Sequence, residues 1–294
     1  MQNTVTEQTY SPKIKLIECP RDAMQGWKNF IPTEKKIEYI NALLKVGFDT
    51  IDFGSFVSPK AMPQMADTKE VIGKLQLVNS KSKLLAIVAN TRGAEEALQY
   101  DGITYLGFPF SVSATFQMRN TNSSLEGSLK DVEFIQNLCI KNKKELVVYI
   151  SMGFGNPYGD KYNKDIVMQW ADKLIGLEIK VLSIADTVGL AEPSQITSIL
   201  DKLITQYSHT EIGVHLHSTS LNWKLKIDAA LQAGCKRFDG ALKGIGGCPL
   251  ANDDLVGNIN TELMIPYFEQ LSLLPELNKD ALQKALILAN KIFQ

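Results

Sequence analysis

The chain has 294 residues, of which 45% are hydrophobic and 21% are charged, and its formal net charge is −1. These values predict a globular protein with a full core, and they exclude the basic surface that a nucleic-acid-binding protein needs. No apolar run approaches the roughly 20 residues of a membrane span, so we expect no membrane partner.

Residues 1–12 come first and are polar, with the pattern of neither a secretory signal nor a mitochondrial presequence. We expect them to form a loose tail ahead of one domain that covers residues 13–294. The four cysteines of the chain lack the spacing of a zinc site or a redox motif, which predicts free thiols in the reducing cytoplasm. They are Cys19, Cys139, Cys235 and Cys248.

From residue 13 onward, short β-branched runs alternate with segments of helical periodicity. The predicted strands are 13–19, 49–54, 83–89, 102–107, 145–151, 179–185, 211–217 and 236–240. The predicted helices between them are 33–46, 68–77, 124–141, 164–175, 193–207 and 221–233. Eight alternating strands without a composition break favour an α/β fold of the (β/α)8 TIM-barrel type, with additional C-terminal helices that cap or extend it.

An open doubly wound sheet is the alternative architecture. It is expected to carry a Gly-rich phosphate turn after its first strand, whereas this chain continues with Cys19-Pro-Arg-Asp22. A closed barrel therefore fits the chain better.

The most informative motif is His215-Leu-His217, at the end of the seventh predicted strand. Alternation along a strand sends both imidazoles to one side, at a separation that suits a single cation. The alternative is two polar side chains on a solvated strand face, but the neighbouring Ile212, Val214 and Leu216 are apolar. Imidazole is the commonest side-chain metal ligand, so the motif favours a metal site.

Other chemically capable residues lie at the carboxyl ends of the predicted strands, where the active sites of such barrels form. They are Arg21, Asp22, Asp52, Ser151, Asp186 and Cys248. Singly, each has a structural interpretation: Asp22 as a helix cap, Asp186 as a turn residue, Arg21 as a surface charge, Cys248 as an incidental thiol. Their shared location favours catalysis, and a thiol in a Gly-rich loop is more plausibly reactive than one in a core.

Two histidines with Asp22 and a side-chain amide make a mixed nitrogen and oxygen ligand set. Such a set suits a six-coordinate divalent cation, Mg²⁺ or Mn²⁺, better than a structural thiolate zinc site. Substrate oxygens would occupy the open positions.

Five blocks in consistent order resemble the 3-hydroxy-3-methylglutaryl-CoA lyases, which belong to the metal-dependent DRE-TIM barrels. The blocks are Arg21-Asp22-Ala-Met-Gln25, Ser55-Phe-Val-Ser-Pro-Lys60 with Pro63-Gln-Met-Ala-Asp67, Ala185-Asp-Thr-Val-Gly189, His215-Leu-His217 and Gly244-Ile-Gly-Gly-Cys-Pro249. The second and the last are specific to the lyase branch, and the likeness extends from about Lys13 to Glu262.

The resemblance implies cleavage of (S)-3-hydroxy-3-methylglutaryl-CoA to acetyl-CoA and acetoacetate by a retro-Claisen reaction. It implies that Asp22, His215, His217 and Asn258 hold the cation, and that His215 or Asp22 takes the proton of the tertiary hydroxyl. Arg21 would lie against the thioester carbonyl, with Cys248 as the acid of a mobile loop. Asp52 is also expected in the catalytic set.

Substrate contacts are expected from Arg21, Gln25, Ser151, Asp186 and Glu262. The expected partner is a small acyl-CoA, and the expected assembly is a homodimer. Two other functions stay open at this point: a related lyase or aldolase acting on another 3-hydroxyacyl-CoA, and a silent barrel that binds metal or acyl-CoA.

Three positions depart from the family pattern. Asp52 stands where the family usually has Glu, and Ser218 where it usually has Asp or Asn beside the second metal histidine. The segment Glu18-Cys-Pro-Arg21 is one residue shorter than usual, which puts the role of Glu18 in doubt. These changes indicate either a different acyl chain or a divergent branch.

Overall fold

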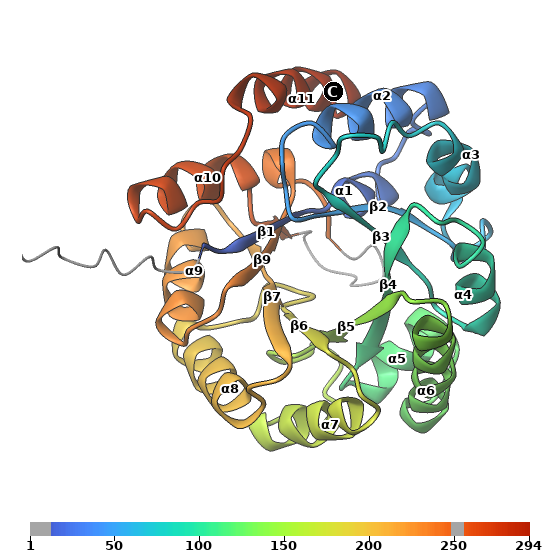
Figure 1. The fold of residues 1–294 in the computed structure, drawn as a ribbon. Helices are drawn as coiled ribbons and strands as arrows, with labels where there is room; N and C mark the ends of the chain where they lie inside the picture. Colours follow the sequence, from blue (N-terminus) through green and yellow to red (C-terminus); the bar gives the residue numbers. More distant parts are fainter. Residues whose placement is uncertain (1–12, 248–255) are drawn as a thin grey trace, which may run out of the picture.

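The structure is a computed structural model that describes residues 13–247 and 256–294. Eight parallel strands close into a barrel in the order β1-β2-β3-β4-β5-β6-β7-β9, and Figure 1 shows the helices arranged around it. The predicted TIM barrel is confirmed. The expected tail at 1–12 and the predicted acid Cys248 lie outside the described residues. None of the described helices is long and apolar enough to cross a membrane.

The barrel strands are β1 (Lys15–Glu18), β2 (Thr50–Ser55), β3 (Lys83–Ile87), β4 (Ile103–Ser111), β5 (Glu145–Ser151), β6 (Val181–Ala185), β7 (Glu211–His215) and β9 (Arg237–Gly240). One expectation about the strands is wrong in detail, because the seventh strand ends at His215. His217 and Ser218 instead form β8 (His217–Ser218), which pairs antiparallel with β10 (Gly257–Asn258). The chain leaves the barrel between the two histidines.

The helices are α1 (Pro20–Gln25), α2 (Thr33–Leu43), α3 (Thr68–Gly73), α4 (Thr91–Ala97), α5 (Ala114–Thr121), α6 (Leu125–Lys141), α7 (Lys164–Gly176), α8 (Pro193–Gln206), α9 (Trp223–Gln232), α10 (Thr261–Gln270) and α11 (Lys279–Ile292), with 3-10 turns η1 (Pro63–Met65) and η2 (Leu242–Gly244). Side-chain caps define several starts: Ser124, for example, accepts the Gly127 N–H at the start of α6. The expected C-terminal helices are present, and α11 packs on α2 (Figure 1).

The barrel interior divides into an apolar side and a polar side. Buried Leu85, Ile87, Tyr105, Val147, Tyr149 and Val181 form a cluster separate from the main core between strands and helices. The opposite side carries the buried Arg237 and Asp239 of β9. Gly213 on β7 provides space for Arg237, because a Cβ at Gly213 would lie 2.7 Å from the Arg237 Cδ. The polar side lies directly below the ends of β7 and β9.

Glu18, whose role the shortened first-strand motif left in doubt, connects β1 to the segment after β9. Its two carboxyl oxygens accept the Leu242 N–H at 2.8 Å and the Thr261 hydroxyl at 2.7 Å. Burial raises the pKa of Glu18 to about 8, although both hydrogen bonds oppose that shift. Glu18 is therefore mostly protonated at neutral pH, and it fixes η2 and the start of α10.

This raised pKa predicts a specific dependence of stability on pH. The contribution of Glu18 is fully present below its unfolded pKa of about 4.5 and is lost as the pH rises through about 8. The free energy of unfolding of the wild type should therefore fall across this window by up to about 1.4 kcal/mol per pH unit from this group. Glu18→Gln should flatten the profile in urea unfolding at a series of pH values. An unchanged slope in that variant would assign the effect to another group.

Candidate active and metal site

Arg21 lies at the centre of the residues gathered at the carboxyl end of the barrel. It is the second residue of α1, which begins with Pro20 directly after β1, so its side chain faces the end of β2. Its Nε donates to both oxygens of Asp52 at 3.1 and 3.0 Å, and its Nη2 donates to Oδ2. Both hydrogens of Nη1 go to Asp22 and Gln25. One Nη2 hydrogen is left for a substrate oxygen.

Asp22, His215 and His217 form a three-residue cluster that can hold a metal ion. One ligand atom from each lies within 4.8 Å of the other two. The His215 Nε2 lies 4.0 Å from the Asp22 Oδ2. The His217 Nε2 is buried and has no hydrogen-bond partner among the described residues, so this nitrogen lacks the partner that a buried polar atom needs. A bound cation would provide that partner.

The protonation states of the cluster suit a cation. Burial, and then the neighbouring His215, lower the pKa of His217 to about 4, so its ring is neutral and keeps a lone pair near pH 7. Burial opposes ionisation of Asp22, but the Arg21 charge and then His215 outweigh it and lower the pKa of the carboxyl. Asp22 therefore offers a negative oxygen and His217 a neutral imidazole nitrogen, the donor types that divalent cations bind.

Asn258 reaches the cluster through the small β8–β10 ladder. It pairs with His217 across that ladder, and its Nδ2 donates to the Asp22 Oδ2 at 2.6 Å and to the Ile245 carbonyl at 2.9 Å. The loop before it passes very close at Gly246, where φ is +114° and a Cβ would lie 2.3 Å from the Asn258 Nδ2. Only glycine fits there. The predicted fourth ligand thus lies beside the other three.

Asp239 supports the cluster from below. Its Oδ2 lies 3.2 Å from the His215 Nδ1, and the two residues pair across β7 and β9. Burial opposes the charged ring, but this hydrogen bond and the Asp22 charge raise the pKa of His215. In the neutral ring, an Nδ1–H donated to Asp239 leaves the Nε2 lone pair directed toward Asp22. Asp239 therefore fixes the tautomer that a metal ligand requires.

Asp186 is held by a lysine that we did not expect near the site. Lys226 of α9 is buried, and its Nζ donates to the Asp186 Oδ2 at 2.6 Å, to the His217 carbonyl at 2.8 Å and to the Gly189 carbonyl at 3.1 Å. Asp186 also accepts the Ala191 N–H at 3.0 Å. Lys226 thus joins the loop after β6 to the second histidine. That Asp186 contacts a substrate stays a prediction.

The remaining expected substrate residues differ in where they lie. Gln25 contacts both Arg21 and Asp22, with its Nε2 2.5 Å from the Asp22 Oδ1. Ser151 ends β5 and is buried, and Glu262 lies in the first turn of α10, where its carboxylate accepts from the Asn260 amide. Their contacts with a substrate also stay predictions.

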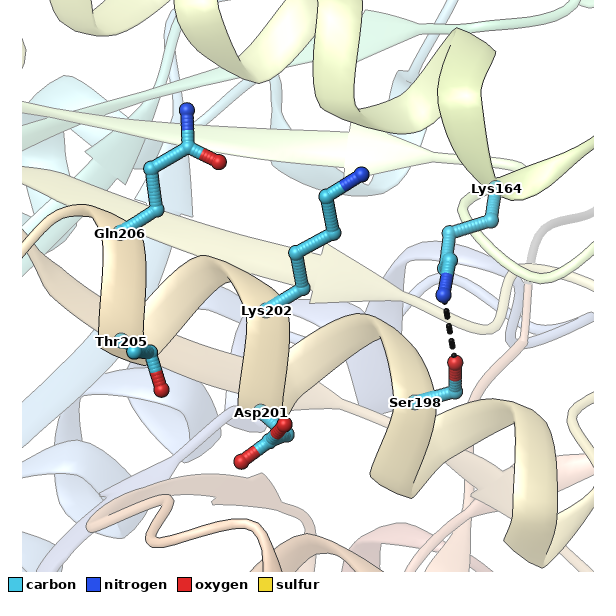
Figure 2. Close-up of a pocket in the computed structure, with 6 residues that line it drawn as sticks. All are labelled: Lys164, Ser198, Asp201, Lys202, Thr205 and Gln206. Atoms are coloured by element: carbon cyan, nitrogen blue, oxygen red, sulfur yellow. Dashed lines mark hydrogen bonds between the residues drawn. The ribbon is translucent and has the colours of Figure 1, made fainter.

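A separate groove lies on the outer layer of helices, between α7 and α8 (Figure 2). It has a volume of about 460 Å³ and is lined by Lys164, Ser198, Asp201, Lys202, Thr205 and Gln206. Lys164 Nζ donates to the Ser198 hydroxyl at 2.8 Å. None of the site residues lines this groove, so it does not compete with the barrel end as the candidate active site.

Comparison with known proteins agrees with this geometry. The family model described as HMGL-like matches residues 13–288. The chain belongs to the HMGL-like family. A curated relative, the hydroxymethylglutaryl-CoA lyase YngG of Bacillus subtilis, is 33% identical over 90% of this chain and 88% of its own length. The human cytoplasmic 3-hydroxy-3-methylglutaryl-CoA lyase is 31% identical over 88% of this chain and 70% of its own length.

Solved structures give the same result. The Bacillus subtilis HMG-CoA lyase superposes with a TM-score of 0.89 at 31% identity, covering 96% of this chain and 94% of that one. An HMG-CoA lyase from Acinetobacter baumannii, in complex with coenzyme A and 3-methylmalate, superposes with a TM-score of 0.88 at 28% identity, covering 96% and 91%. The family resemblance inferred from the five blocks is confirmed.

Within this HMGL-like barrel, Asp239 and Lys226 are the residues that sequence reasoning missed. Asp239 lies in the predicted strand 236–240, and its place near the end of that strand is the signal that points to the site. Lys226 gave no such signal, because a lysine in an amphipathic helix is typically exposed. Its burial depends on Asp186, a residue of a different βα unit.

The position of Asp239 predicts an effect on metal affinity. Asp239→Asn keeps the size of the side chain but removes the charge that holds the His215 Nδ1–H. We expect Mn²⁺ to bind this variant about tenfold to hundredfold more weakly than the wild type in isothermal titration calorimetry. Ser183→Ala is the matched control, because Ser183 is also buried in the barrel strands but its hydroxyl has no partner among the described residues. Equal weakening in both variants would contradict a specific role of Asp239.

Proposed function

We propose that this protein is a divalent-metal-dependent lyase that cleaves (S)-3-hydroxy-3-methylglutaryl-CoA to acetyl-CoA and acetoacetate. The observation that carries the proposal is the convergence of Asp22, His215, His217 and Asn258 next to the buried Arg21. Relatives named as lyases for this thioester match most of the chain, and one related structure holds coenzyme A. The substrate, Mg²⁺ or Mn²⁺ as the cation, a homodimeric state and a cytoplasmic location are parts of this proposal.

The residues that would hold the cation fit it in charge and donor type, as the unpartnered His217 Nε2 and the ionised Asp22 indicate. When bound, a divalent cation lowers the pKa of a coordinated tertiary hydroxyl and so eases its deprotonation. The chain supplies the base for this step, His215 or Asp22, which takes the hydroxyl proton. If His215 is that base, its Nε2 takes the proton only while it is not bound to the cation, and Asp239 on the far side of the ring would then stabilise the imidazolium.

Loss of the hydroxyl proton drives cleavage of the carbon–carbon bond, which releases acetoacetate and leaves the enolate of the acetyl thioester. Arg21 directs its remaining Nη2 hydrogen and its positive charge to that developing oxyanion. One preorganised contact of this kind is worth about 3–4 kcal/mol. Asp52 fixes the guanidinium through both Nε and Nη2, so that little reorganisation is needed during the reaction. Cys248 is proposed to protonate the enolate carbon.

Assay of a panel of 3-hydroxyacyl-CoA thioesters for acetyl-CoA release tests the proposal. We expect turnover of the 3-hydroxy-3-methylglutaryl thioester, no turnover after chelator treatment, and recovery on adding Mg²⁺ or Mn²⁺. His217→Ala should weaken metal binding at least about tenfold. Turnover of a different thioester alone would reassign the substrate, and full activity of the metal-stripped protein would remove the metal from the mechanism.

Asp52 provides a second test, because its family counterpart is usually one methylene longer. Asp52→Glu should move the Arg21 guanidinium by about one carbon–carbon bond, and a misplacement of about 1 Å can cost about a hundredfold in rate. We therefore expect a changed kcat or a changed preference among the thioesters, measured by steady-state kinetics. Identical kinetics on every thioester would place Asp52 outside the working site.

Cys248 provides a third test, through the reactivity of its thiol and the effect of replacing it. A thiol that protonates carbon must be reachable, so Cys248 should be alkylated faster than Cys19, Cys139 and Cys235, which are all buried free thiols. Mass spectrometry of partially alkylated protein measures this order. Cys248→Ser should keep acyl-CoA binding and lose about a hundredfold or more in kcat. Wild-type turnover by the serine variant would make Cys248 a bystander.

A further inference from the structure

A second group of potential ligands lies beneath the candidate metal site, on the opposite side of the His215 ring. Cys19, His215 and Asp239 each offer one ligand atom, and these atoms lie within 4.8 Å of one another. Cys19 is fully buried and Asp239 is 2% exposed. Only His215 belongs to both groups. The lower group therefore shares one ligand with the upper site and adds a thiol to it.

The barrel backbone fixes this lower group in place. The Cys19 N–H donates to the Gly240 carbonyl at 2.9 Å, which ties the end of β1 to the end of β9. Across the other edge of β9, Asp239 pairs with His215. The strands β7 and β9 therefore deliver the imidazole and the carboxylate, and the residue directly after β1 delivers the thiol, to one point at the barrel end.

The lower group has an unfilled bonding position. Asp239 uses its Oδ2 to contact the His215 Nδ1, but its Oδ1 is buried and has no hydrogen-bond partner in the described part of the chain. Burial, and after it the charges of Asp239, Asp52 and Asp22, raise the pKa of the Cys19 thiol. Burial by itself disfavours any charge, but the negative carboxylates around the thiol favour a cation beside it.

The donor types differ between the two groups, and this difference determines which cation each one prefers. The upper set of Asp22, His215, His217 and Asn258 contains only nitrogen and oxygen donors. The lower set adds sulfur, and a sulfur, nitrogen and oxygen set selects zinc, cadmium or cobalt over magnesium. We propose that Cys19, His215 and Asp239 form a second, overlapping site for a thiophilic divalent cation such as zinc.

Occupation of the two sites is mutually exclusive because they use the same imidazole. A cation in the lower site takes the lone pair of the His215 Nδ1, so the ring hydrogen moves to Nε2, and the thiol proton leaves to solvent. An Nε2 that carries hydrogen cannot coordinate a cation in the upper site. A thiophilic cation in the lower site therefore expels a manganese or magnesium ion from the upper one.

Cobalt titration of the metal-stripped full chain tests this proposal without measuring lyase activity, so it stands or falls separately from the proposed function. Cobalt bound by a thiolate shows a sulfur-to-metal charge-transfer band in the near ultraviolet. We expect this band in the wild type and in His217→Ala, which alters only the upper site. Cys19→Ser should lose the band, whereas Cys235→Ser, which removes another buried thiol of the barrel, should keep it.

Cys248 is a further thiol, so the same titration is made with Cys248→Ser. A band that persists in Cys19→Ser and disappears in Cys248→Ser would overturn the proposal, and so would a wild type with no band at excess cobalt. Competition provides a measurement that needs no variant of Cys19. Zinc added to the manganese-loaded wild type should release Mn²⁺, seen as the free-ion signal in electron paramagnetic resonance.

The zinc concentration that releases Mn²⁺ should differ between Asp239→Asn and the wild type. Asp239→Asn should need at least about tenfold more zinc than the wild type to release its bound Mn²⁺, after correction for its own manganese affinity. Release at the same zinc concentration from both proteins would show that zinc competes at the upper site alone. In that case Cys19 and Asp239 do not form a cation site.

Discussion

Pairing of β9 with both β7 and β1 is the constraint on which the site depends. This pairing closes the barrel, and it places Asp239 of β9 between β7 and β1. On one side it meets His215, and on the other it lies beside the strand that leads into Arg21 and Asp22. Asp22 and His215, which are far apart in the sequence, thus become neighbours in the site. The chemistry follows from this closure.

Closure also buries several charges, and each of them is paired. Arg21 is held by Asp52 and Asp22, and Lys226 by Asp186. Pairs of this kind add little net stability, because desolvation offsets their attraction, but removing one partner costs about 3–5 kcal/mol. Their consequence here is positional. The Arg21 guanidinium is held by two carboxylates, and Lys226 joins the loop after β6 to the His217 backbone.

Much of this arrangement was predictable from the sequence, for a physical reason. Alternation of strands with helical periodicity predicts the barrel, and the rule that sites form at the carboxyl ends of strands brings Arg21, Asp22 and His215 together. The His-x-His spacing predicts that both rings share one site, although the chain leaves the barrel strand after His215. These features are local in sequence, so periodicity and spacing can reveal them.

The rest could not be read from the sequence, because it depends on register between distant strands. Asp239 acts on His215 only because the two residues are paired across β7 and β9, and Cys19 joins them only when β1 completes the barrel. Lys226 is buried only because Asp186 approaches it from another unit. The short spacing of the first-strand motif leaves the role of Glu18 open, and only the fold shows that its carboxyl group accepts the Leu242 N–H and the Thr261 hydroxyl.

The central claim is that Asp22, His215, His217 and Asn258 form one cation site at the carboxyl end of the barrel. Crystals soaked in manganese and measured near its absorption edge test this claim most directly, because anomalous scattering locates the ion without reference to activity. We predict one strong peak about 2 Å from the Asp22 carboxylate and from a ring nitrogen of each histidine. A peak elsewhere on the barrel, or no peak after soaking in excess manganese, would contradict this claim.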